Sequence, residues 1–499
     1  MAIAKVLGLE TEYGIAVKGS ADPNPIAASS ALINAYVAEL SRRVGWDFED
    51  ETPGRDARGF SREAAAPPEI ETHLVNAVLT NGARYYVDHA HPEYSTPECS
   101  TVREVVTYDK AGELILARSV EAAGRLLPPG QQLVVLKNNS DGKGNSYGTH
   151  ENYLMDRSVP FSRIAHLVPA HFVTRQVFCG AGKVGVETPG APADVPYQLS
   201  QRAEFFEEEV GLETTLKRPI VNTRDEPHAD PEKYRRLHVI IGDANLSEVS
   251  TYLKVGTTAL VLAMIEDRFI TTDLAVSGSV ASLRAVSHDP TLKHLLTMHD
   301  GRTMTAVQLQ MEYLDLARKF VDDRLGDDAD AQTIDVLARW ESVLTRLEHD
   351  PMQCARELDW VAKLKLLQQY RDRDGLDWDD AKLHLIDLQY SDIRPEKGLY
   401  AKLVAAGRIE RLLDDASVEQ AMHDPPEDTR AYFRGRCLEK YSANVAAASW
   451  DSVIFDLPGR ESLQRVPTID PLRGSKAHVG ALLDECDTAL QLVNRLTAR

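Results

Sequence analysis

The sequence predicts an α+β fold, in which a curved sheet is backed by helices and a small separate domain lies at the C-terminus. Residues 83–88 and 235–241 alternate polar and apolar side chains with the period of two that is typical of half-buried strands. Residues 311–321 have apolar side chains at helical spacing instead. An Asp-Pro-Pro-Glu sequence then interrupts these patterns, so we expect a main domain over residues 1–423 and a small one over 424–499.

Composition and charge restrict the class of protein. The chain has 499 residues, 43% of them hydrophobic and 26% charged, so we expect a soluble globular protein with a sizeable core. The formal net charge of −20 would repel nucleic acids and acidic membranes, so neither is expected as a partner. An acidic protein partner would need a locally basic, partly apolar track on this surface.

Three further features favour a cytoplasmic location. The N-terminal residues lack the charged-then-apolar pattern of a signal peptide. The longest apolar run, Val255–Ile265, is too short to span a bilayer. The five cysteines are scattered, with no C-x-x-C motif, which indicates thiols in a reducing compartment that serve as small core residues.

The first predicted strand, Lys5–Ile15, places two carboxylates on one face. Glu10 and Glu12 are two residues apart, so their side chains point the same way. Like charges side by side repel unless a cation lies between them, which makes the pair a candidate divalent-metal site. The alternative is an acidic pair that faces solvent. A helix is expected next, over Ala27–Ser41.

Residues 47–72 break these patterns. The segment mixes acids, arginines, glycine and proline, and it has neither helical nor strand periodicity. A long irregular stretch within a compact domain is usually functional or mobile. We interpret it as a mobile insertion loop near the active site, and the alternative is a disordered surface loop.

The segment Asn81–Cys99 carries the polar face around which the predicted site is organised. Its Asn-Gly start is a turn signal, and the residues that follow alternate as a strand does. Three polar side chains share one face of that strand, namely Arg84, Tyr86 and Asp88. Pro92 and Pro97 then stiffen a non-helical segment that carries Glu93 and Glu98. Such a group of carboxylates suits metal binding and acid–base chemistry, and the alternative is an edge strand with a solvated polar face.

Two later segments present basic or neutral polar groups. If Ser146–Tyr153 is extended, His150 and Asn152 share a face. In the strand that starts at residue 235, Arg236 and His238 face away from the apolar side. A cation and an imidazole on a half-buried sheet suit phosphate binding, metal ligation or oxyanion stabilisation. We therefore expect one curved sheet whose concave face is the site.

The remainder of the chain is mainly helical by pattern. Helices are expected over 245–269, 336–346 and 357–369, and residues 383–390 form a late strand or helix. No P-loop occurs, and no G-x-G-x-x-G follows a strand, so any nucleotide is held by another device. From the residues alone the expectation is a metal-dependent enzyme of unknown substrate.

Six motifs, in this order, resemble those of the Pup ligase/depupylase family. They are Gly8–Gly14, Asn81–Asp88, His91–Tyr94, Gly148–Tyr153, Thr223–Asp230 and Arg235–Asn245. The resemblance implies the glutamine synthetase-like carboxylate–amine ligase fold, with a curved antiparallel sheet cradle backed by helices. The sequence His89–Glu93 and the 47–72 insertion are similar to the branch that deamidates Pup and removes it from conjugates.

The resemblance also assigns roles to individual residues. It implies Asp88 as the catalytic aspartate. Metal ligands are implied at Glu10, Tyr86, Glu93, His150 and His238. Contacts to a nucleotide are implied at Arg84, Ser95, Thr96, Asn152, Arg236 and Trp450. Tyr86 departs from the usual carboxylate or imidazole ligand.

The expected reaction is hydrolysis of the C-terminal side-chain amide of Pup, and of the isopeptide bond between Pup and a lysine. The resemblance implies ATP and Mg²⁺ as cofactors, with Asp88 acting on water as a base or on the carbonyl as a nucleophile. It implies Pup and pupylated proteins as partners, with an indirect link to the proteasomal ATPase machinery. The alternative is a Pup–protein ligase that uses ATP to activate the glutamate of Pup.

Overall fold

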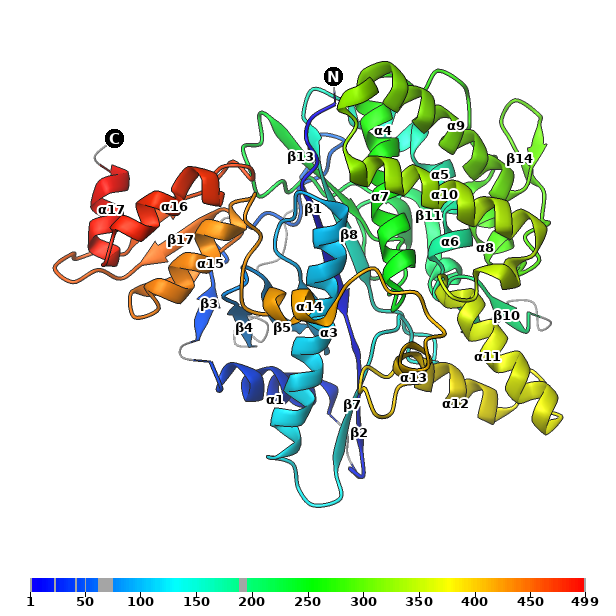
Figure 1. Cartoon of the computed structure of the whole chain (residues 1–499), viewed down its shortest axis with the longest axis horizontal. Helices are drawn as coiled ribbons and strands as arrows, with labels where there is room; N and C mark the ends of the chain where they lie inside the picture. Colours follow the sequence, from blue (N-terminus) through cyan, green and yellow to red (C-terminus); the bar gives the residue numbers. More distant parts are fainter. Residues whose placement is uncertain are drawn as a thin grey trace.

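A ten-stranded sheet forms the centre of the molecule, in a computed structural model that describes residues 2–21, 24–40, 43–49, 51–61, 75–187 and 195–497. In spatial order its strands are β13 (Tyr234–Val239), β8 (Thr149–Asp156), β1 (Leu7–Glu12), β6 (His91–Ser95), β5 (Arg84–Asp88), β4 (Asn76–Val78), β3 (Val44–Trp46), β16 (Val445–Ala448), β17 (Ser452–Phe455) and β18 (Gln464–Pro467). Neighbours are antiparallel except β3 and β16, which are parallel. The expected α+β fold, with a curved sheet backed by helices, is confirmed (Figure 1).

Among the described residues, four two-stranded pairs lie outside this sheet. They are β2 (Gly14–Lys18) with β7 (Gln132–Leu136), β9 (Lys183–Val184) with β10 (Tyr197–Gln198), β11 (Phe206–Gly211) with β12 (Arg218–Asn222), and β14 (Leu296–Thr297) with β15 (Thr303–Met304). The predicted first strand is thus two strands, since β1 ends at Glu12 and β2 begins at Gly14.

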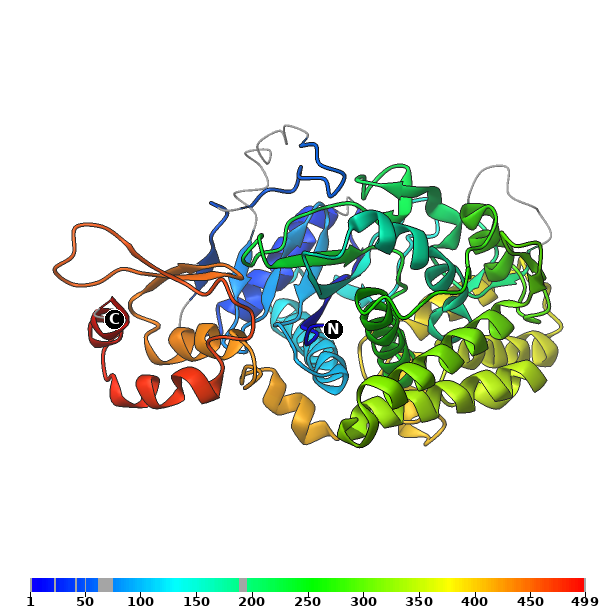
Figure 2. The same ribbon diagram turned by 90° about the horizontal axis from the view of Figure 1, so that it is seen from above.

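Helices gather on one side of the sheet and at one end of the molecule, as the view from above shows (Figure 2). Their bounds are α1 (Pro25–Val37), α3 (Val102–Gly124), α4 (Phe161–Leu167), α5 (Pro169–Thr174), α6 (Gln176–Cys179), α7 (Glu248–Glu266), α8 (Ser279–Ser287), α9 (Ala306–Arg324), α10 (Ala331–His349), α11 (Asp359–Asp374), α12 (Ala381–Tyr390), α13 (Leu399–Ala405), α14 (Asp415–Ala421), α15 (Ala431–Lys440), α16 (Lys476–Glu485) and α17 (Ala489–Thr497). The segment 383–390, which the sequence left open as strand or helix, is helical.

Two core helices show how local sequence sets these elements. Helix α3, which the sequence analysis did not predict, starts with a capping box in which Thr101 and Glu104 satisfy each other's backbone N–H groups. Helix α7 is long and apolar enough to cross a membrane by composition, but 89% of its apolar window is buried inside the protein. It packs against α10 and α3 and is a core helix.

The C-terminal residues form a hydrophobic cluster of their own. It contains Phe433, Leu438, Val453, Phe455 and Leu492, among others. Three residues from the N-terminal half complete it, namely Val44, Trp46 and Val78. The sheet also continues from β3 into β16, so the C-terminal part is joined to the main sheet by backbone pairing. The division into domains 1–423 and 424–499 stays a prediction.

All five cysteines are buried free thiols, as the scattered spacing predicted. The strand β6 is notable because it contains Pro92 within the sheet. Pro92 lies opposite Val87 of β5, while the pairing of β6 with β1 begins only at Glu93. A proline nitrogen cannot donate to a ladder, so it is tolerated here at the point where the second ladder has ended.

Candidate active site

Strand register brings one carboxylate and two imidazoles together on the sheet. Glu10 on β1 lies directly opposite His150 on β8, and His238 lies on β13, the next strand. One ligand atom of each residue lies within 4.8 Å of the others. The His150 Nδ1 atom is 3.6 Å from Glu10 Oε2, and the two imidazole rings are 4.9 Å apart. We call Glu10, His150 and His238 the His–Glu cluster.

Polar neighbours hold this cluster in place. Asn152 donates from Nδ2 to Glu10 Oε1 at 2.9 Å. Arg236 donates from Nη1 to Asn152 Oδ1 at 2.7 Å and lies 3.6 Å from Glu10 Oε1. The predicted nucleotide contacts Asn152 and Arg236 therefore adjoin the predicted metal ligands.

Electrostatics set the protonation states of the His–Glu cluster. Burial alone would raise the pKa of the Glu10 carboxyl, but its close contacts with His150, His238 and Arg236 lower that pKa well below its ordinary value. Burial lowers the pKa of His150, and burial together with Arg236 lowers the pKa of His238 well below its usual range. An ionised carboxylate beside neutral imidazoles is the form that binds a metal ion.

A second group consists of carboxylates alone. Glu12 lies opposite Glu93 on β6, and Asp88 ends the neighbouring strand β5. Their ligand atoms lie within 4.8 Å of one another, and we call the three residues the carboxylate cluster. Glu10 and Glu12, which the sequence placed on one face, thus belong to two different groups. Glu93 lies with Glu12 and Asp88, whereas the sequence analysis grouped it with the histidines as a metal ligand.

Gly148 fits tightly between the two clusters. Its N–H donates to Glu12 Oε1 at 2.9 Å. A Cβ atom at this position would lie 2.3 Å from His150 Nε2 and 2.9 Å from Glu12 Oε1. Only glycine therefore leaves room for both side chains.

Burial and mutual repulsion raise the pKa values of two members of the carboxylate cluster, Glu12 and Glu93. Burial, followed by the charge of Asp88, raises the pKa of Glu12 to about 7. Burial and the charges of Asp88, Glu12 and Glu10 raise the pKa of Glu93 well above its ordinary value. The crowded Glu12 and Glu93 carboxyls, whose pKa values are raised, and the neighbouring Asp88 carboxylate would be stabilised by a divalent cation, and an all-oxygen donor set is the one that Mg²⁺ prefers. The chemistry of this cluster therefore fits the magnesium ion that the resemblance implies, whereas imidazole donors are more typical of transition metals.

Asp88 lies where a substrate can reach it. It is the last residue of β5, and its side chain is 39% exposed. The next residue, His89, has a positive φ of 50° and holds its Nδ1 atom 2.9 Å from Asp88 Oδ2. Burial alone would raise the pKa of Asp88, but this hydrogen bond helps to lower it, so the carboxylate is ionised and can accept a proton.

Tyr86 and Arg84 lie on the same face of β5 but make different contacts. Burial and the charge of Glu93 raise the pKa of Tyr86 well above its ordinary value, so the phenol is neutral, and its hydroxyl lies 3.5 Å from Ser95 Oγ. The Arg84 guanidinium stacks over the rings of Tyr86 and Trp46, at 4.0 Å from each. The predicted role of Tyr86 as a metal ligand stays a prediction.

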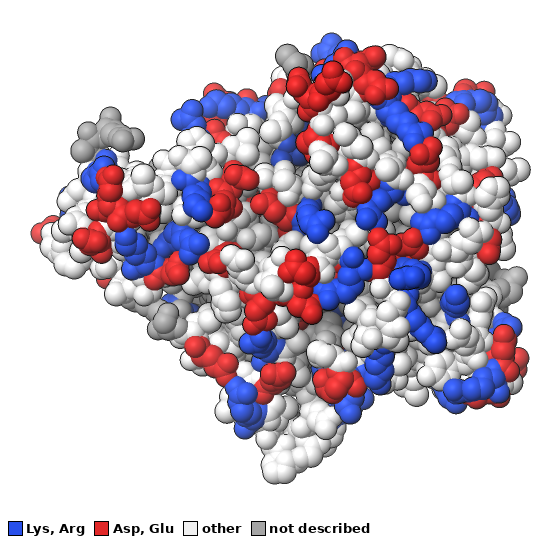
Figure 3. Space-filling view, in the orientation of Figure 1, with Lys and Arg blue, Asp and Glu red and all other residues white. Residues whose placement is uncertain are grey.

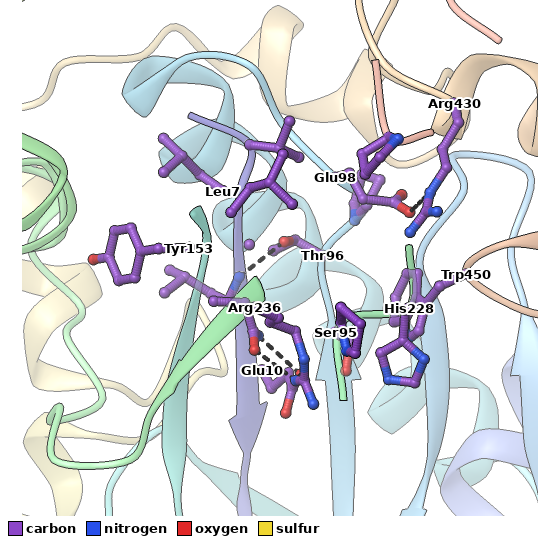
Figure 4. Close-up of a pocket in the computed structure, with 18 residues that line it drawn as sticks. Leu7, Glu10, Ser95, Thr96, Glu98, Tyr153, His228, Arg236, Arg430 and Trp450 are labelled. Carbon is purple, nitrogen blue, oxygen red and sulfur yellow. Dashed lines mark hydrogen bonds and ion pairs between the residues drawn. The ribbon is translucent and has the colours of Figure 1, made fainter. Parts of the chain in front are cut away.

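A pocket of about 550 Å³, partly open to solvent, lies beside the His–Glu cluster (Figure 4). Five of the six predicted nucleotide contacts line it, namely Ser95, Thr96, Asn152, Arg236 and Trp450. Glu10 lines it too, whereas Arg84 does not and reaches it only through Trp46, whose ring is 5.1 Å from that of Trp450. The pocket thus runs from Glu10 toward the C-terminal part of the chain.

Among the lining residues that the sequence analysis did not place in this pocket, three have acidic or basic side chains. They are Glu98, His228 and Arg430. Glu98 was expected to join the other acids after β5, but it lies apart from the carboxylate cluster and binds two arginines of the C-terminal part instead. His228 has a positive φ of 46°, which no local motif indicated. Arg430 follows the Asp-Pro-Pro-Glu sequence, a signal that was read only as a boundary.

The described part of the 47–72 insertion lies beside the site. The Thr52 N–H donates to the Glu226 carboxylate, which is itself 3.6 Å from Arg236. Asp56 is buried and accepts a hydrogen bond from Thr223 Oγ1 at 2.7 Å. The mobility predicted for the loop stays a prediction, since residues 50 and 62–74 lie outside the described residues.

The sequence of this chain is similar to those of several known proteins. The sequence model of the Pup-ligase protein family matches residues 5–454. A depupylase of Acidothermus cellulolyticus is 63% identical, and a Pup deamidase/depupylase of Mycolicibacterium smegmatis is 53% identical, each over 99% of both chains. A Pup–protein ligase of Xylanimonas cellulosilytica is 42% identical over 96% of this chain and 99% of its own.

Two solved structures have the same fold. The complex between Pup and its ligase PafA matches with a TM-score of 0.81 and 34% identity, covering 99% of this chain and 93% of that one. The ligase PafA in complex with ADP matches with a TM-score of 0.75 and 36% identity, covering 85% of this chain and 96% of that one.

Proposed function

The chain belongs to the Pup-ligase family, and within it we propose that the protein hydrolyses the C-terminal side-chain amide of Pup and the isopeptide bond that joins Pup to lysines. The observation that carries this proposal is the identity of 63% and 53% to a depupylase and a deamidase/depupylase, against 42% to a ligase. The position of Asp88, ionised and accessible beside the Glu12 and Glu93 carboxyls, supports hydrolytic chemistry.

The reaction replaces a C–N bond with a C–O bond at the side-chain carbonyl of the last residue of Pup. Asp88 accepts a proton from the attacking water, or attacks the carbonyl to give an anhydride that water then opens. Ammonia leaves in deamidation, and the amino group of the lysine leaves in depupylation. His89 holds one oxygen of Asp88 by its hydrogen bond and leaves the other for the reaction.

The residues present fit a bound magnesium nucleotide. Glu12 and Glu93 would hold the cation beside Asp88, and the cation would neutralise their charge and polarise the carbonyl under attack. Asn152 and Arg236 lie where they would bind phosphate oxygens, since they line the pocket next to Glu10. The ADP complex of PafA, a relative of the same fold, supports ATP as the nucleotide.

Partners and location are part of the same proposal. Pup and pupylated proteins are the substrates, and the proteasomal ATPase machinery is linked to the enzyme only indirectly. On the face shown in Figure 3, Lys and Arg alternate with Asp and Glu, so the charge of −20 is not concentrated there in one acidic patch. Five buried thiols support a cytoplasmic location.

The discriminating experiment incubates the purified chain with Pup ending in glutamine and with ATP and Mg²⁺. We expect ammonia to be released without a matching amount of ADP, and the Asp88→Asn variant to release none while still binding Pup. ADP formed in step with attachment of a Pup ending in glutamate to lysine would instead identify a ligase. Full turnover by Asp88→Asn would remove Asp88 from its proposed role.

A further inference from the structure

The C-terminal part of the chain supplies one wall of the pocket. Arg430 and Trp450 line it from that side, while Glu10 and Ser95 line it from the sheet (Figure 4). Arg430 immediately precedes helix α15, and Trp450 lies between β16 and β17. A ligand that reaches both sides therefore touches two parts of the chain that are more than 300 residues apart in sequence.

Glu98 joins these two sides. Its carboxylate accepts a hydrogen bond from Arg430 Nε at 2.7 Å, and it is paired with the Arg434 guanidinium. Its backbone carbonyl accepts a further hydrogen bond from Thr429 Oγ1 at 2.7 Å. Glu98 also lines the pocket, directly beyond Ser95 and Thr96.

Burial makes this interaction strong. The side chains of Arg430 and Arg434 are 3% and 1% exposed, and that of Glu98 is 13% exposed. Burial by itself raises the pKa of Glu98, but Arg434 and Arg430 outweigh it and lower the pKa to about 2. The carboxylate is therefore ionised at every pH at which the enzyme would work.

Arg434, which is paired with Glu98, also contacts Trp450. Its Nη1 atom donates to the backbone carbonyl of Trp450 at 2.9 Å, and its guanidinium lies 5.1 Å from the centre of the indole ring. Its Nη2 atom also donates to the carbonyl of Gly82 at 2.9 Å, in the turn before β5. Trp450 in turn packs edge-on against Trp46, which stacks under Arg84.

Arg430 has a donor left for a ligand. Its Nε is bound to Glu98, and its Nη1 donates to the carbonyl of Thr468 at 2.9 Å. Its Nη2 makes no hydrogen bond to any residue that the structure describes. This donor lies at the end of the pocket remote from Glu10, where the nucleoside would lie if the phosphates bind Asn152 and Arg236.

From these contacts we infer that Arg430 binds the nucleoside part of the nucleotide, and that Glu98 is the positioning residue that sets Arg430 and Trp450 against it. The inference rests on the proposed use of a nucleotide and adds two residues to that site. A nucleotide then bridges the sheet and the C-terminal part, so binding depends on the geometry that Glu98 imposes.

The experiment measures nucleotide affinity in wild-type protein and in Glu98→Gln, with a fluorescent ATP analogue and with the ATP dependence of Pup cleavage. We expect the Kd and the KM for ATP to rise about tenfold or more, because misplaced contacts lose binding energy. We expect kcat at saturating ATP and the KM for Pup to change less than about twofold, since Glu98 touches neither Asp88 nor the carboxylate cluster. Glu98→Asp keeps the charge, so its Kd and KM for ATP should lie between those of wild type and Glu98→Gln.

The matched control is Arg436→Ala. Arg436 lies on the same helix, but its ion pairs with Asp424 and Glu439 are at the surface. We expect its nucleotide affinity to equal that of wild type. An unchanged affinity in Glu98→Gln, with only a lower melting temperature, would overturn the inference and leave Glu98 a structural residue.

Arg430→Met tests the same inference without removing the Glu98–Arg434 pair. It should lose nucleotide affinity, while its melting temperature without nucleotide should fall less than that of Glu98→Gln because Glu98 keeps its pair with Arg434. Unchanged affinity would contradict a role for Arg430. If the wild-type chain shows no ATP-dependent cleavage of Pup, the proposed function fails. The binding measurements with the fluorescent analogue would still decide the inference about Glu98.

Discussion

The ion pairs of Glu98 predict a pH-dependent contribution to stability that Glu98→Gln should remove. Folding lowers the pKa of this carboxyl from 4.5 to about 2. Since one pKa unit is worth about 1.4 kcal/mol, the ionised carboxylate contributes about 3 kcal/mol at neutral pH. A carboxyl whose pKa is depressed by folding contributes its full amount above its unfolded pKa and loses it as the pH falls toward the folded value. The contribution should therefore decline to about 1 kcal/mol near pH 3.

The assay is urea unfolding of wild type and Glu98→Gln at several pH values, followed by tryptophan fluorescence. The difference in the free energy of unfolding should be about 3 kcal/mol near pH 7 and should shrink as the pH falls below about 4.5, because glutamine does not titrate. Glu427→Gln is the matched control, since Glu427 pairs with Lys476 at the surface with a 57% exposed side chain and should show almost no difference. A difference for Glu98→Gln that is the same at all pH values would refute the argument.

Two further substitutions test the packing of the site and of the core. Gly148→Ala should lower the rate of Pup cleavage by about a hundredfold, because the added methyl group displaces the His150 ring. Gly45→Ala is the control and should leave activity unchanged, because no atom lies within 4 Å of the added Cβ. Equal activity of the two variants in the Pup-cleavage assay would contradict the tight fit at Gly148. Arg175→Met should cost about 3–5 kcal/mol in urea unfolding, because it leaves the Glu151 carboxylate buried without its partner at 2.6 Å. A loss below about 1 kcal/mol would show that Glu151 finds another partner.

Local periodicity accounts for much of what was predictable. The alternation of Arg84, Tyr86 and Asp88 predicted strand β5 and its polar face, and both are observed. Helix α3 could also have been found, since Thr101 and Glu104 form a recognisable capping box before an apolar run. These features depend only on residues that are close together in the sequence, so they can be predicted from the sequence.

The arrangement of the site was less predictable because register and long-range pairing decide it. Glu10 and Glu12 point the same way from β1, yet one lies opposite His150 and the other opposite Glu93. The order of the strands around β1, which joins residues far apart in sequence, creates this difference. A period of two predicts which side chains share one face of a strand, but it does not predict which residues of the neighbouring strands lie opposite them.

The sequence by itself determined the α+β class, the family and the polar residues that converge on the site. Hydrophobic periodicity and short motifs are local properties, so they can be recognised from the sequence without a structure. Only the tertiary structure decided that Glu10 and Glu12 belong to different clusters and that Glu98 lies apart from both. Glu98 is paired with Arg430 and Arg434 instead. A buried carboxylate takes whichever cations the fold places within hydrogen-bonding distance, and here those cations come from more than 300 residues away.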